Sequence, residues 1–255
     1  GVDTVVHTAG LIGGRVADPL YTGLQINIGG TINVLEAMRR TGVKRIVYGS
    51  TTWVYSDTEG DDLDEDTLLA PPSHLYSVTK LASEYYCRSY QELYGLEPTI
   101  LRYGIPYGPR ARAGAVVPIF VNRALRGETI TIAGDGSQFR QFVYVEDLAE
   151  GNVLAMKPIA KGRTYNLDGA ERVTIRQIAE TVQKVVGQAK IEYGPPRPGD
   201  FSGKIISSRR ALKELDWKPV VSFEEGVRRY VEWYKQTQDD KENRWAAVDP
   251  ELSIS

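Results

Sequence analysis

The sequence predicts an α/β protein with a doubly wound parallel sheet and a second, smaller α/β domain. Strand-like apolar segments alternate with helix-like segments over about the first 100 residues. Such alternation is typical of a parallel α/β sheet. The strand-like segment at 44–49 has a continuous apolar core, as expected of a strand buried on both faces. After Gly108-Pro109 the pattern changes, which indicates the second domain.

In the first half, each element follows from apolar periodicity and from residues that end helices. The helix at 24–40 carries apolar residues at helical spacing, and Gly42 is expected to end it. Pro71-Pro72-Ser73 is expected to cap the next helix. The predicted elements are a strand at 4–7, a helix at 24–40, a strand at 44–49, a solvated acidic loop at 57–66, a helix from 73 to 94 and a strand at 98–101.

In the second half, Thr174 is expected to cap a helix, and the prolines at 194–199 require a loop. The predicted elements are a helix at 118–126, strands at 129–132 and 142–145 with a turn at 134–136 between them, a helix from 147, and helices at 175–186, 208–215 and 223–235. A polar, loosely held tail is expected from 236. We assign 1–109 and 138–168 to the larger domain, 110–137 and 169–240 to the smaller one, and 241–255 to the tail.

The composition of the chain argues against several classes of function. A net charge of -2 gives no basic surface for nucleic acid or an anionic membrane. No apolar run approaches the roughly 20 residues that cross a bilayer. The two histidines, His7 and His74, lack metal-ligand spacing, and Cys87 is the single cysteine, so no internal disulfide forms. We expect a cytoplasmic protein with no metal, no nucleic-acid partner and no membrane.

Three residues form an acid–base pattern. Tyr76 and Lys80 lie four apart, so a helix places both on one face, about 5–6 Å apart at Cβ. A tyrosine hydroxyl has a pKa of about 10, and a nearby ammonium favours the phenolate. Thr51 ends a predicted parallel strand, where sites gather. A chance pair is the alternative, because the chain has 15 tyrosines. In this order along the chain, Thr51, Tyr76 and Lys80 predict proton transfer coupled to hydride transfer with a nicotinamide.

Several segments together resemble a known family. They lie, in order, at 2–9, 27–31, 48–55, 76–80, 101–109, 134–147 and 197–200. With these segments the chain resembles an extended short-chain dehydrogenase/reductase of the NAD-dependent sugar-nucleotide epimerase/dehydratase type, and the resemblance covers nearly all of it. It implies a Rossmann-like sheet, NAD (with NADP not excluded) and a nucleotide-sugar substrate carrying UDP, dTDP or GDP.

The resemblance also implies roles for residues. Tyr76 would be the acid or base, Lys80 would lower its pKa and hold the nicotinamide ribose, and Thr51 would orient the reacting oxygen. The implied cofactor contacts are Thr8, Ala9, Gly10, Asn27, Gly49, Ser50, Tyr76, Lys80 and Tyr103. The implied substrate contacts are Thr52, Ile105, Val117, Arg140, Arg197 and Asp200. Both arginines suit a diphosphate, although either one alone would suit a surface salt bridge.

Relatives commonly form a homodimer through two helices of each subunit. A homodimer is therefore expected, with an aromatic interface on the second of the predicted helices. Its side chains would be Tyr85, Tyr86, Tyr90 and Leu93. The alternative is that these rings pack on the sheet.

The sequence departs from the family pattern at its start. The family's Gly-x-x-Gly-x-x-Gly turn, which binds the pyrophosphate, does not occur, and the glycines at 10–14 are spaced wrongly for it. We expect that about 60 residues of N-terminal strands and helices are missing, which would leave the strand at 4–7 with a bare edge. Thr52-Trp53 stands where 4,6-dehydratases carry an acidic pair, Ile105 replaces an asparagine and Gln141 an aspartate.

Three functions therefore stay open. The first is an NAD-dependent sugar-nucleotide epimerase, which returns the hydride to the opposite face. The second is a dehydrogenase or reductase of the same fold with net redox turnover. The third is a non-catalytic remnant that binds a nucleotide sugar or a partner protein.

Overall fold

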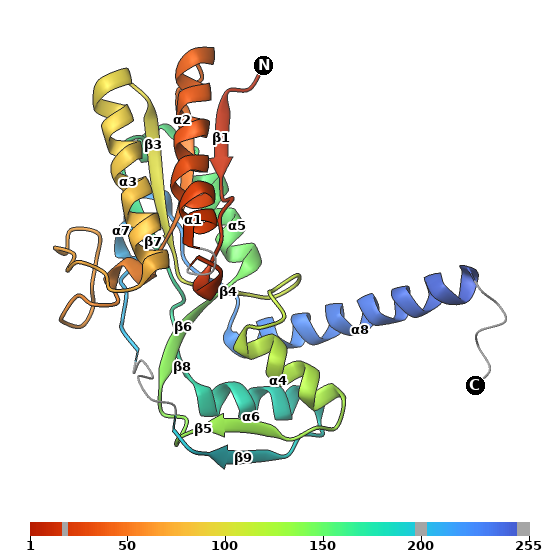
Figure 1. Cartoon of the computed structure of the whole chain (residues 1–255). Coiled ribbons are helices and arrows are strands. Elements are labelled where there is room, and N and C mark those ends of the chain that lie inside the picture. Colours follow the sequence, from red (N-terminus) through yellow and green to blue (C-terminus); the bar gives the residue numbers. More distant parts are fainter. Residues whose placement is uncertain (17–19, 197–202, 249–255) are drawn as a thin grey trace. The chain divides into compact units, whose positions relative to one another are not determined.

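The computed structural model describes residues 1–16, 20–196 and 203–248 (Figure 1). The chain forms two compact units. Unit 1 comprises Gly1–Pro106, Gln141–Arg172 and Lys204–Val220, and unit 2 comprises Tyr107–Arg140, Val173–Gly203 and Val221–Ser255. The segment Lys204–Val220 was expected in the smaller domain, but it belongs to unit 1, because Leu215 and Trp217 join the core of that unit.

Unit 1 is built on a four-stranded parallel sheet of order β1-β2-β3-β7. Its strands are β1 (Thr4–His7), β2 (Arg45–Thr51), β3 (Glu97–Tyr103) and β7 (Thr164–Leu167). Register aligns Thr51 with Tyr103 and Tyr103 with Leu167, so the carboxyl ends of three strands form one row. Strand β7 was not predicted from the sequence. Strand β1 lies at the edge of the sheet, where 45% of the Val6 surface is exposed.

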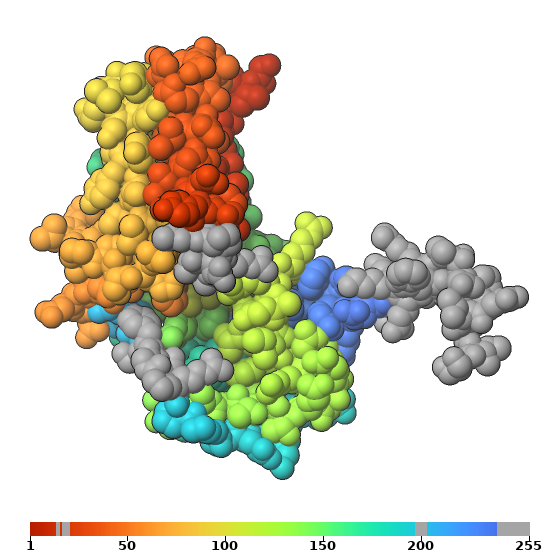
Figure 2. Space-filling view, in the orientation of Figure 1, coloured from red at the N-terminus to blue at the C-terminus, as the bar shows by residue number. Residues whose placement is uncertain are grey.

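Helices cover both faces of this sheet. On one face α2 and α3 lie side by side (Figures 1 and 2) and pack on Ile46 and Tyr48 of β2. On the other face α5 and α7 pack on Val47. Alternate residues of β2 thus enter opposite cores, as a strand buried on both faces requires. The predicted doubly wound α/β class is confirmed. The helical elements of unit 1 are η1 (Gly13–Val16), α1 (Leu20–Leu24), η2 (Gln25–Gly29), α2 (Gly30–Thr41), η3 (Thr52–Tyr55), α3 (Leu75–Tyr94), α5 (Val145–Leu154), η4 (Pro158–Ala160) and α7 (Arg209–Leu215).

The predicted helix at 24–40 is interrupted. A π-helical turn, η2, joins α1 to α2, and Gly30 N–H donates to Gln25 O across it. Such turns re-aim side chains and are frequent at functional sites. Here the turn carries Asn27, which is buried. Gly42 ends α2 in the left-handed conformation, as predicted.

Unit 2 has a two-stranded parallel sheet, in which β5 pairs with β9. Thr174 caps α6 with a capping box, as expected from the sequence. The prediction of a loosely held tail from 236 is wrong for residues 236–248, because α8 continues through them. The elements of unit 2 are α4 (Val116–Leu125), β5 (Ile130–Ala133), α6 (Ile175–Val186), β9 (Ile191–Gly194) and α8 (Phe223–Val248).

Three further strands contain three of the five points where the chain passes from one unit to the other. They pair in the order β4-β6-β8. Their bounds are β4 (Ile105–Tyr107), β6 (Phe139–Tyr144) and β8 (Arg172–Thr174). Across the described part of the chain, no helix has the length and apolarity that a membrane span requires.

Candidate active site

Helix α3 carries Tyr76 and Lys80 at its N-terminal end. His74, rather than the predicted Ser73, caps this helix, and its Nδ1 accepts from the Tyr76 N–H at 3.3 Å. Ser73 instead donates its hydroxyl to Asp57 Oδ1 at 2.9 Å. A second link ties α3 to the segment after β2, because Ser77 Oγ donates to Trp53 O at 3.0 Å.

Tyr76 and Thr51 meet at the carboxyl end of β2. Thr51 is buried, and its hydroxyl accepts from Trp53 N–H at 3.2 Å, which starts the turn η3. Burial raises the pKa of Tyr76, and a hydrogen bond with Thr51 partly offsets this rise. The sequence-based expectation that Lys80 lowers the pKa of Tyr76 is therefore not met in this structure. Without further positive charge, Tyr76 keeps its proton and is set up as an acid.

Lys80 lies one turn further along α3, beneath the end of β2. Its Nζ donates to Gly49 O at 2.8 Å and sits 5.1 Å from the centre of the Tyr48 ring. Burial lowers the pKa of Lys80 to about 8, although the charge of Glu84 opposes this shift. Lys80 therefore stays mostly charged near neutral pH and can lose its proton just above it.

We expect Lys80→Met to stabilise the fold near neutral pH. The folded-state pKa of Lys80, about 8, lies below its ordinary value of 10.5, so below pH 8 the native state holds a buried charge. This cost is relieved as pH rises from 8 to 10.5, because the native state has then released the proton and the unfolded chain has not. The variant should gain roughly 1–3 kcal/mol at about pH 7 and much less at about pH 10. Urea unfolding at both pH values measures this, and a variant that is less stable at both would contradict it.

The loop after β1 lies against Lys80 and Asn27. Asn27 fixes the loop, because its Oδ1 accepts from the Leu11 N–H at 2.7 Å and its Nδ2 donates to the Leu11 carbonyl at 3.0 Å. Asn27 Nδ2 also donates to Thr79 Oγ1 at 2.9 Å. A Cβ on Gly10 would lie 3.1 Å from Asn27 Oδ1 and 3.4 Å from Lys80 Nζ. The predicted cofactor residues Thr8, Ala9 and Gly10 are exposed, and Gly10 lies beside this lysine.

Gly49 and Tyr103 pack directly on one another. A Cβ on Gly49 would lie 2.7 Å from Tyr103 Cε2, so only glycine fits there while the ring stays in place. Tyr103 OH donates to Asn152 Oδ1 at 2.6 Å, and burial raises its pKa to about 12. Ser50, also predicted to contact the cofactor, turns its hydroxyl the other way, toward Glu84.

The predicted substrate residues that the structure describes belong to both units. Thr52 is buried at the start of η3, and Ile105 lies in β4, both in unit 1. Val117 is buried in α4, and Arg140 donates to Phe139 O at 2.7 Å; both belong to unit 2. Arg197 and Asp200 lie outside the described residues. The structure thus brings together Thr51, Tyr76, Lys80, Gly10, Asn27, Gly49 and Tyr103, and it leaves the substrate contacts as a prediction.

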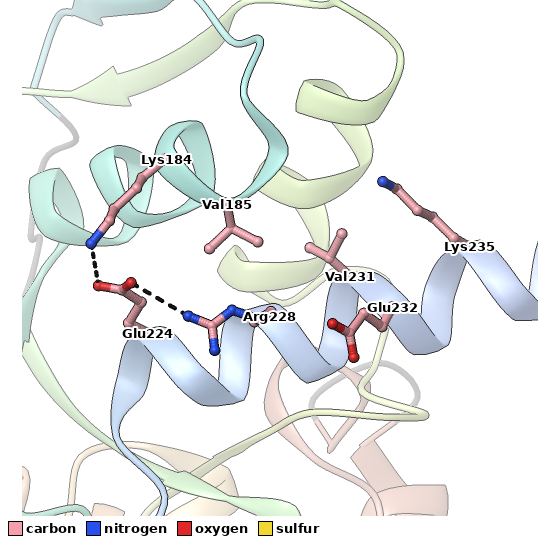
Figure 3. Close-up of a pocket in the computed structure, with 7 residues that line it drawn as sticks. All are labelled: Lys184, Val185, Glu224, Arg228, Val231, Glu232 and Lys235. Carbon is pink, nitrogen blue, oxygen red and sulfur yellow. Dashed lines mark hydrogen bonds and ion pairs between the residues drawn. The ribbon is translucent and has the colours of Figure 1, made fainter.

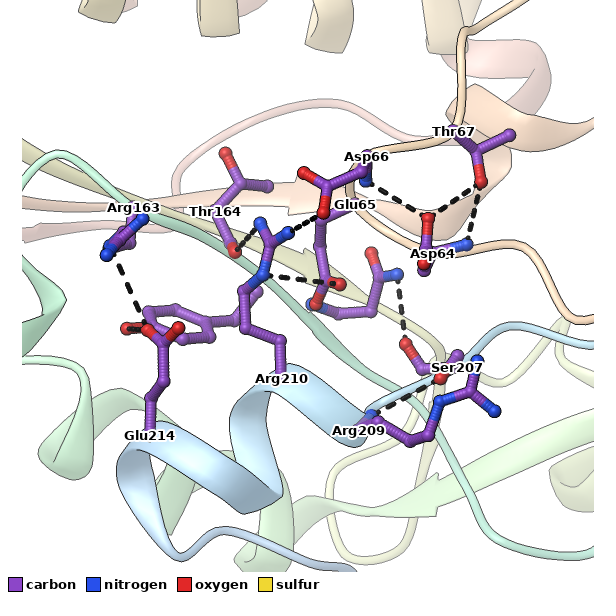
Figure 4. A network of polar contacts seen from close by, with 12 residues as sticks. Asp64, Glu65, Asp66, Thr67, Arg163, Thr164, Ser207, Arg209, Arg210 and Glu214 are labelled. Atoms are coloured by element: carbon purple, nitrogen blue, oxygen red, sulfur yellow. Dashed lines mark hydrogen bonds and ion pairs between the residues drawn. The ribbon is translucent and has the colours of Figure 1, made fainter.

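The acidic segment 57–66 is not simply a solvated loop (Figure 4). Leu63 is buried and pairs with Ile206. Glu65 Oε1 accepts from Asn166 N–H at 2.7 Å, and Arg210 of α7 binds Asp66 at 2.5 Å. Basic side chains of α7 and the end of β7 therefore hold this segment, which leads from Thr51 to Tyr76, in a defined conformation.

Unit 2 has a groove of about 380 Å³ between α6 and α8 (Figure 3). Lys184 and Arg228 both bind Glu224, at 2.8 and 3.6 Å, so the charges there largely satisfy each other. Of the predicted site residues that the structure describes, none lines this groove. Among the described residues, no cluster of His, Cys, Asp or Glu side chains is arranged to hold a metal.

A doubly wound parallel sheet with polar side chains at the carboxyl ends of its strands is the arrangement of nucleotide-binding α/β proteins. The sequence model of the NAD dependent epimerase/dehydratase family matches residues 1–168. The chain belongs to this family, as the sequence-based resemblance predicted.

Relatives support the same assignment. UDP-glucuronate 4-epimerase of Thermodesulfobacterium geofontis is 34% identical over 92% of this chain and 73% of the relative. The crystal structure of UDP-glucose 4-epimerase from Thermotoga maritima with UDP-glucose superposes with a TM-score of 0.87 at 31% identity, covering 92% of this chain and 78% of that one. UDP-glucuronic acid 4-epimerase from Bacillus cereus, in complex with UDP-glucuronic acid and NAD, gives 0.84 at 30% identity, covering 92% and 76%. The chain is accordingly an enzyme of an NAD-dependent family, and NAD is its cofactor.

The residues on this face suit that cofactor. Gly10 has no Cβ, so the space that a Cβ would fill beside Lys80 and Asn27 stays open. Lys80 supplies a positive charge and hydrogen-bond donors, which a ribose hydroxyl can accept. Tyr76, Lys80 and Gly10 are therefore the residues of unit 1 that would hold the nicotinamide end of NAD.

Proposed function

We propose that this chain is an epimerase that acts on a UDP-sugar, with Tyr76, Lys80 and Thr51 as its acid–base residues. The observation that carries the proposal is the meeting of Tyr76 and Thr51 at the carboxyl end of β2, with Lys80 one turn along α3. The relatives with UDP-glucose and UDP-glucuronate activities support the choice of UDP over dTDP or GDP.

The proposed chemistry begins at one sugar hydroxyl. Thr51 orients the hydroxyl oxygen, and Tyr76 Oη takes its proton while the adjacent C–H bond breaks with loss of a hydride. NAD, when bound, supplies the hydride acceptor. Burial keeps Tyr76 protonated in the chain by itself, so the phenolate form that this step needs requires further positive charge beside the ring, which the oxidised nicotinamide would supply when bound. Tyr76 then returns the proton as hydride is added to the opposite face of the sugar carbon, which inverts the centre with no net redox change.

Binding measurements separate this proposal from its alternatives. Calorimetric titration of the chain with NAD and, separately, with UDP-glucose should show binding of both. UDP-glucose binding without NAD binding would favour the non-catalytic remnant. A lasting change in the nicotinamide absorbance band after UDP-glucose and NAD are mixed would favour net redox turnover. The same titration with dTDP- and GDP-glucose tests the choice of nucleotide.

We also infer a homodimer that forms through the exposed face of α3. Tyr85 is 62% exposed and Leu93 is 70% exposed on this helix. Tyr90, which was expected at the interface, instead donates its hydroxyl to Glu36 Oε1 of α2 at 2.8 Å.

The free thiol of Cys87 fits a reducing compartment, which supports a cytoplasmic location.

Leu93→Glu should convert the dimer to a monomer, because it places a charge in an apolar interface. Sedimentation velocity measures the change. Leu68→Glu is the matched control, since Leu68, two residues after the acidic segment, is 91% exposed and its substitution should leave the assembly unchanged. A wild-type chain that sediments as a monomer would contradict the dimer.

A further inference from the structure

Two hydrogen bonds join α3 to the end of β2, directly before Thr51. Lys80 Nζ donates to Gly49 O at 2.8 Å, and Ser50 Oγ donates to Glu84 Oε1 at 2.5 Å. Lys80 and Glu84 lie one helical turn apart, so the two bonds connect adjacent residues of β2 to adjacent turns of α3. The sequence pattern did not single out Glu84, although its spacing of four from Lys80 places it on the same helix face.

A buried ion pair fixes Glu84 from the neighbouring strand. Arg102 of β3 donates to both carboxylate oxygens of Glu84, at 3.0 and 2.7 Å. Arg102 also donates to Tyr55 OH at 2.6 Å, and Tyr55 donates to Asn166 Oδ1 of β7 at 3.0 Å. The Arg102 and Glu84 side chains are only 8% and 5% exposed. The network therefore connects β2, α3, β3 and β7 at the level of the site.

A buried ion pair of this kind is weak evidence for stability, because desolvation offsets most of the attraction between the charges. Its better-attested use is to fix how elements register against one another. In this structure the elements concerned are β2, which carries Thr51, and α3, which carries Tyr76 and Lys80.

We propose that Glu84, held by Arg102 and bonded to Ser50, is a positioning residue that fixes α3 against the end of β2 and so sets Tyr76 and Lys80 relative to Thr51. This inference deepens the proposed function and rests on it for its catalytic meaning. The effect of the Glu84 charge on Lys80 can be tested on the chain without cofactor or substrate.

Glu84 also acts on the charge of Lys80. The titratable groups that face Lys80 are Glu84 and Cys87 on its own helix, His7 on β1 and Tyr48 on β2, and Tyr76 lies one turn earlier. Burial lowers the pKa of Lys80, and Glu84 is the first of the groups that oppose this. Loss of the carboxylate should therefore release the Lys80 proton at lower pH.

The first test is a ¹³C NMR titration of the lysine ε-carbons, with the Lys80 signal assigned from Lys80→Arg. The wild-type midpoint should lie near the pKa of about 8. In Glu84→Gln it should fall below the wild-type value, and in Tyr165→Phe it should not move. Tyr165 is the matched control, since its hydroxyl donates to Glu214 Oε2 of α7 at 2.7 Å and takes no part in the bonds among Ser50, Glu84 and Arg102. An unchanged midpoint in Glu84→Gln would overturn the proposal.

A second variant covers the case in which Glu84→Gln leaves Arg102 unpaired and does not fold. Ser50→Ala keeps the ion pair and removes only the bond to β2. Backbone amides at 49–53 should exchange with solvent about fivefold faster in this variant, the factor expected for one lost hydrogen bond. Tyr165→Phe should leave that segment unchanged. Exchange at 49–53 that stays at the wild-type rate in Ser50→Ala would overturn the proposal, whether or not the chain turns over UDP-sugars.

Discussion

Tyr76→Phe should lose turnover on UDP-sugars by about 100- to 10,000-fold, the range typical of a removed acid–base group. The phenyl ring keeps the packing of Tyr76 at the start of α3 and removes only the hydroxyl that meets Thr51. Stability should change by no more than about 1 kcal/mol, because one hydrogen bond is lost. Initial rates and thermal unfolding of the same preparations measure both effects.

Tyr86→Phe is the control for this prediction. Tyr86 lies on the same helix and is 40% exposed, so its hydroxyl should not matter to turnover. Wild-type turnover in Tyr76→Phe would remove Tyr76 from the mechanism. An equal loss in both variants would show that the helix, rather than the hydroxyl, was disturbed.

Gly49→Ala should destabilise unit 1 by roughly 1–3 kcal/mol, the usual cost of forcing an extra group into a packed core. The new Cβ would lie 2.7 Å from Tyr103 Cε2 and 3.2 Å from its hydroxyl oxygen, so the ring or the strand must move. Because Gly49 O is the acceptor for Lys80, any shift of the strand also displaces the lysine. Turnover should therefore fall together with stability.

Two companion variants test this reason. Gly29→Ala introduces a Cβ with no atom within 4 Å, so it should cost nothing measurable. Gly49→Ala combined with Tyr103→Val should lose less stability than the sum of the single changes, since the clash is shared. Urea unfolding of these three variants, of Tyr103→Val alone and of the wild type gives the values to compare. Additive losses would show that the clash with Tyr103 is not the cause.

Local sequence signals predicted the elements whose bounds are set by residues within or directly beside them. Helix α6 was predicted with its observed bounds, because Thr174 and Gln177 form its capping box and Gly187 ends it in the left-handed conformation. Strand β7 was missed, because a four-residue strand that contains Asn166 has no apolar run of its own. Its burial depends on distant parts of the chain, because β3 pairs with it and Tyr165 and Leu167 join the core with α5 and α7.

The residues of the candidate site also divide into those that local sequence predicts and those that it does not. Tyr76, Lys80 and Thr51 could be predicted, since spacing and strand ends place them without knowledge of the fold. The Ser50–Glu84 bond spans 34 residues, and the Glu65–Asn166 bond spans 101, so no local pattern signals either. The expected effect of Lys80 on the pKa of Tyr76 failed for a related reason: burial, which spacing does not reveal, dominates that pKa.

The central claim is that this chain inverts a sugar centre through Tyr76 without net redox change. The most direct test is proton NMR of UDP-glucose incubated with the chain and NAD, with Tyr76→Phe in parallel. We expect a second UDP-hexose with one inverted ring carbon to accumulate with the wild-type chain and the nicotinamide absorbance band to end unchanged. The variant should form the product at least about 100-fold more slowly. An oxidised sugar with a matching, lasting rise in that band would contradict it, as would equal epimer formation by the variant.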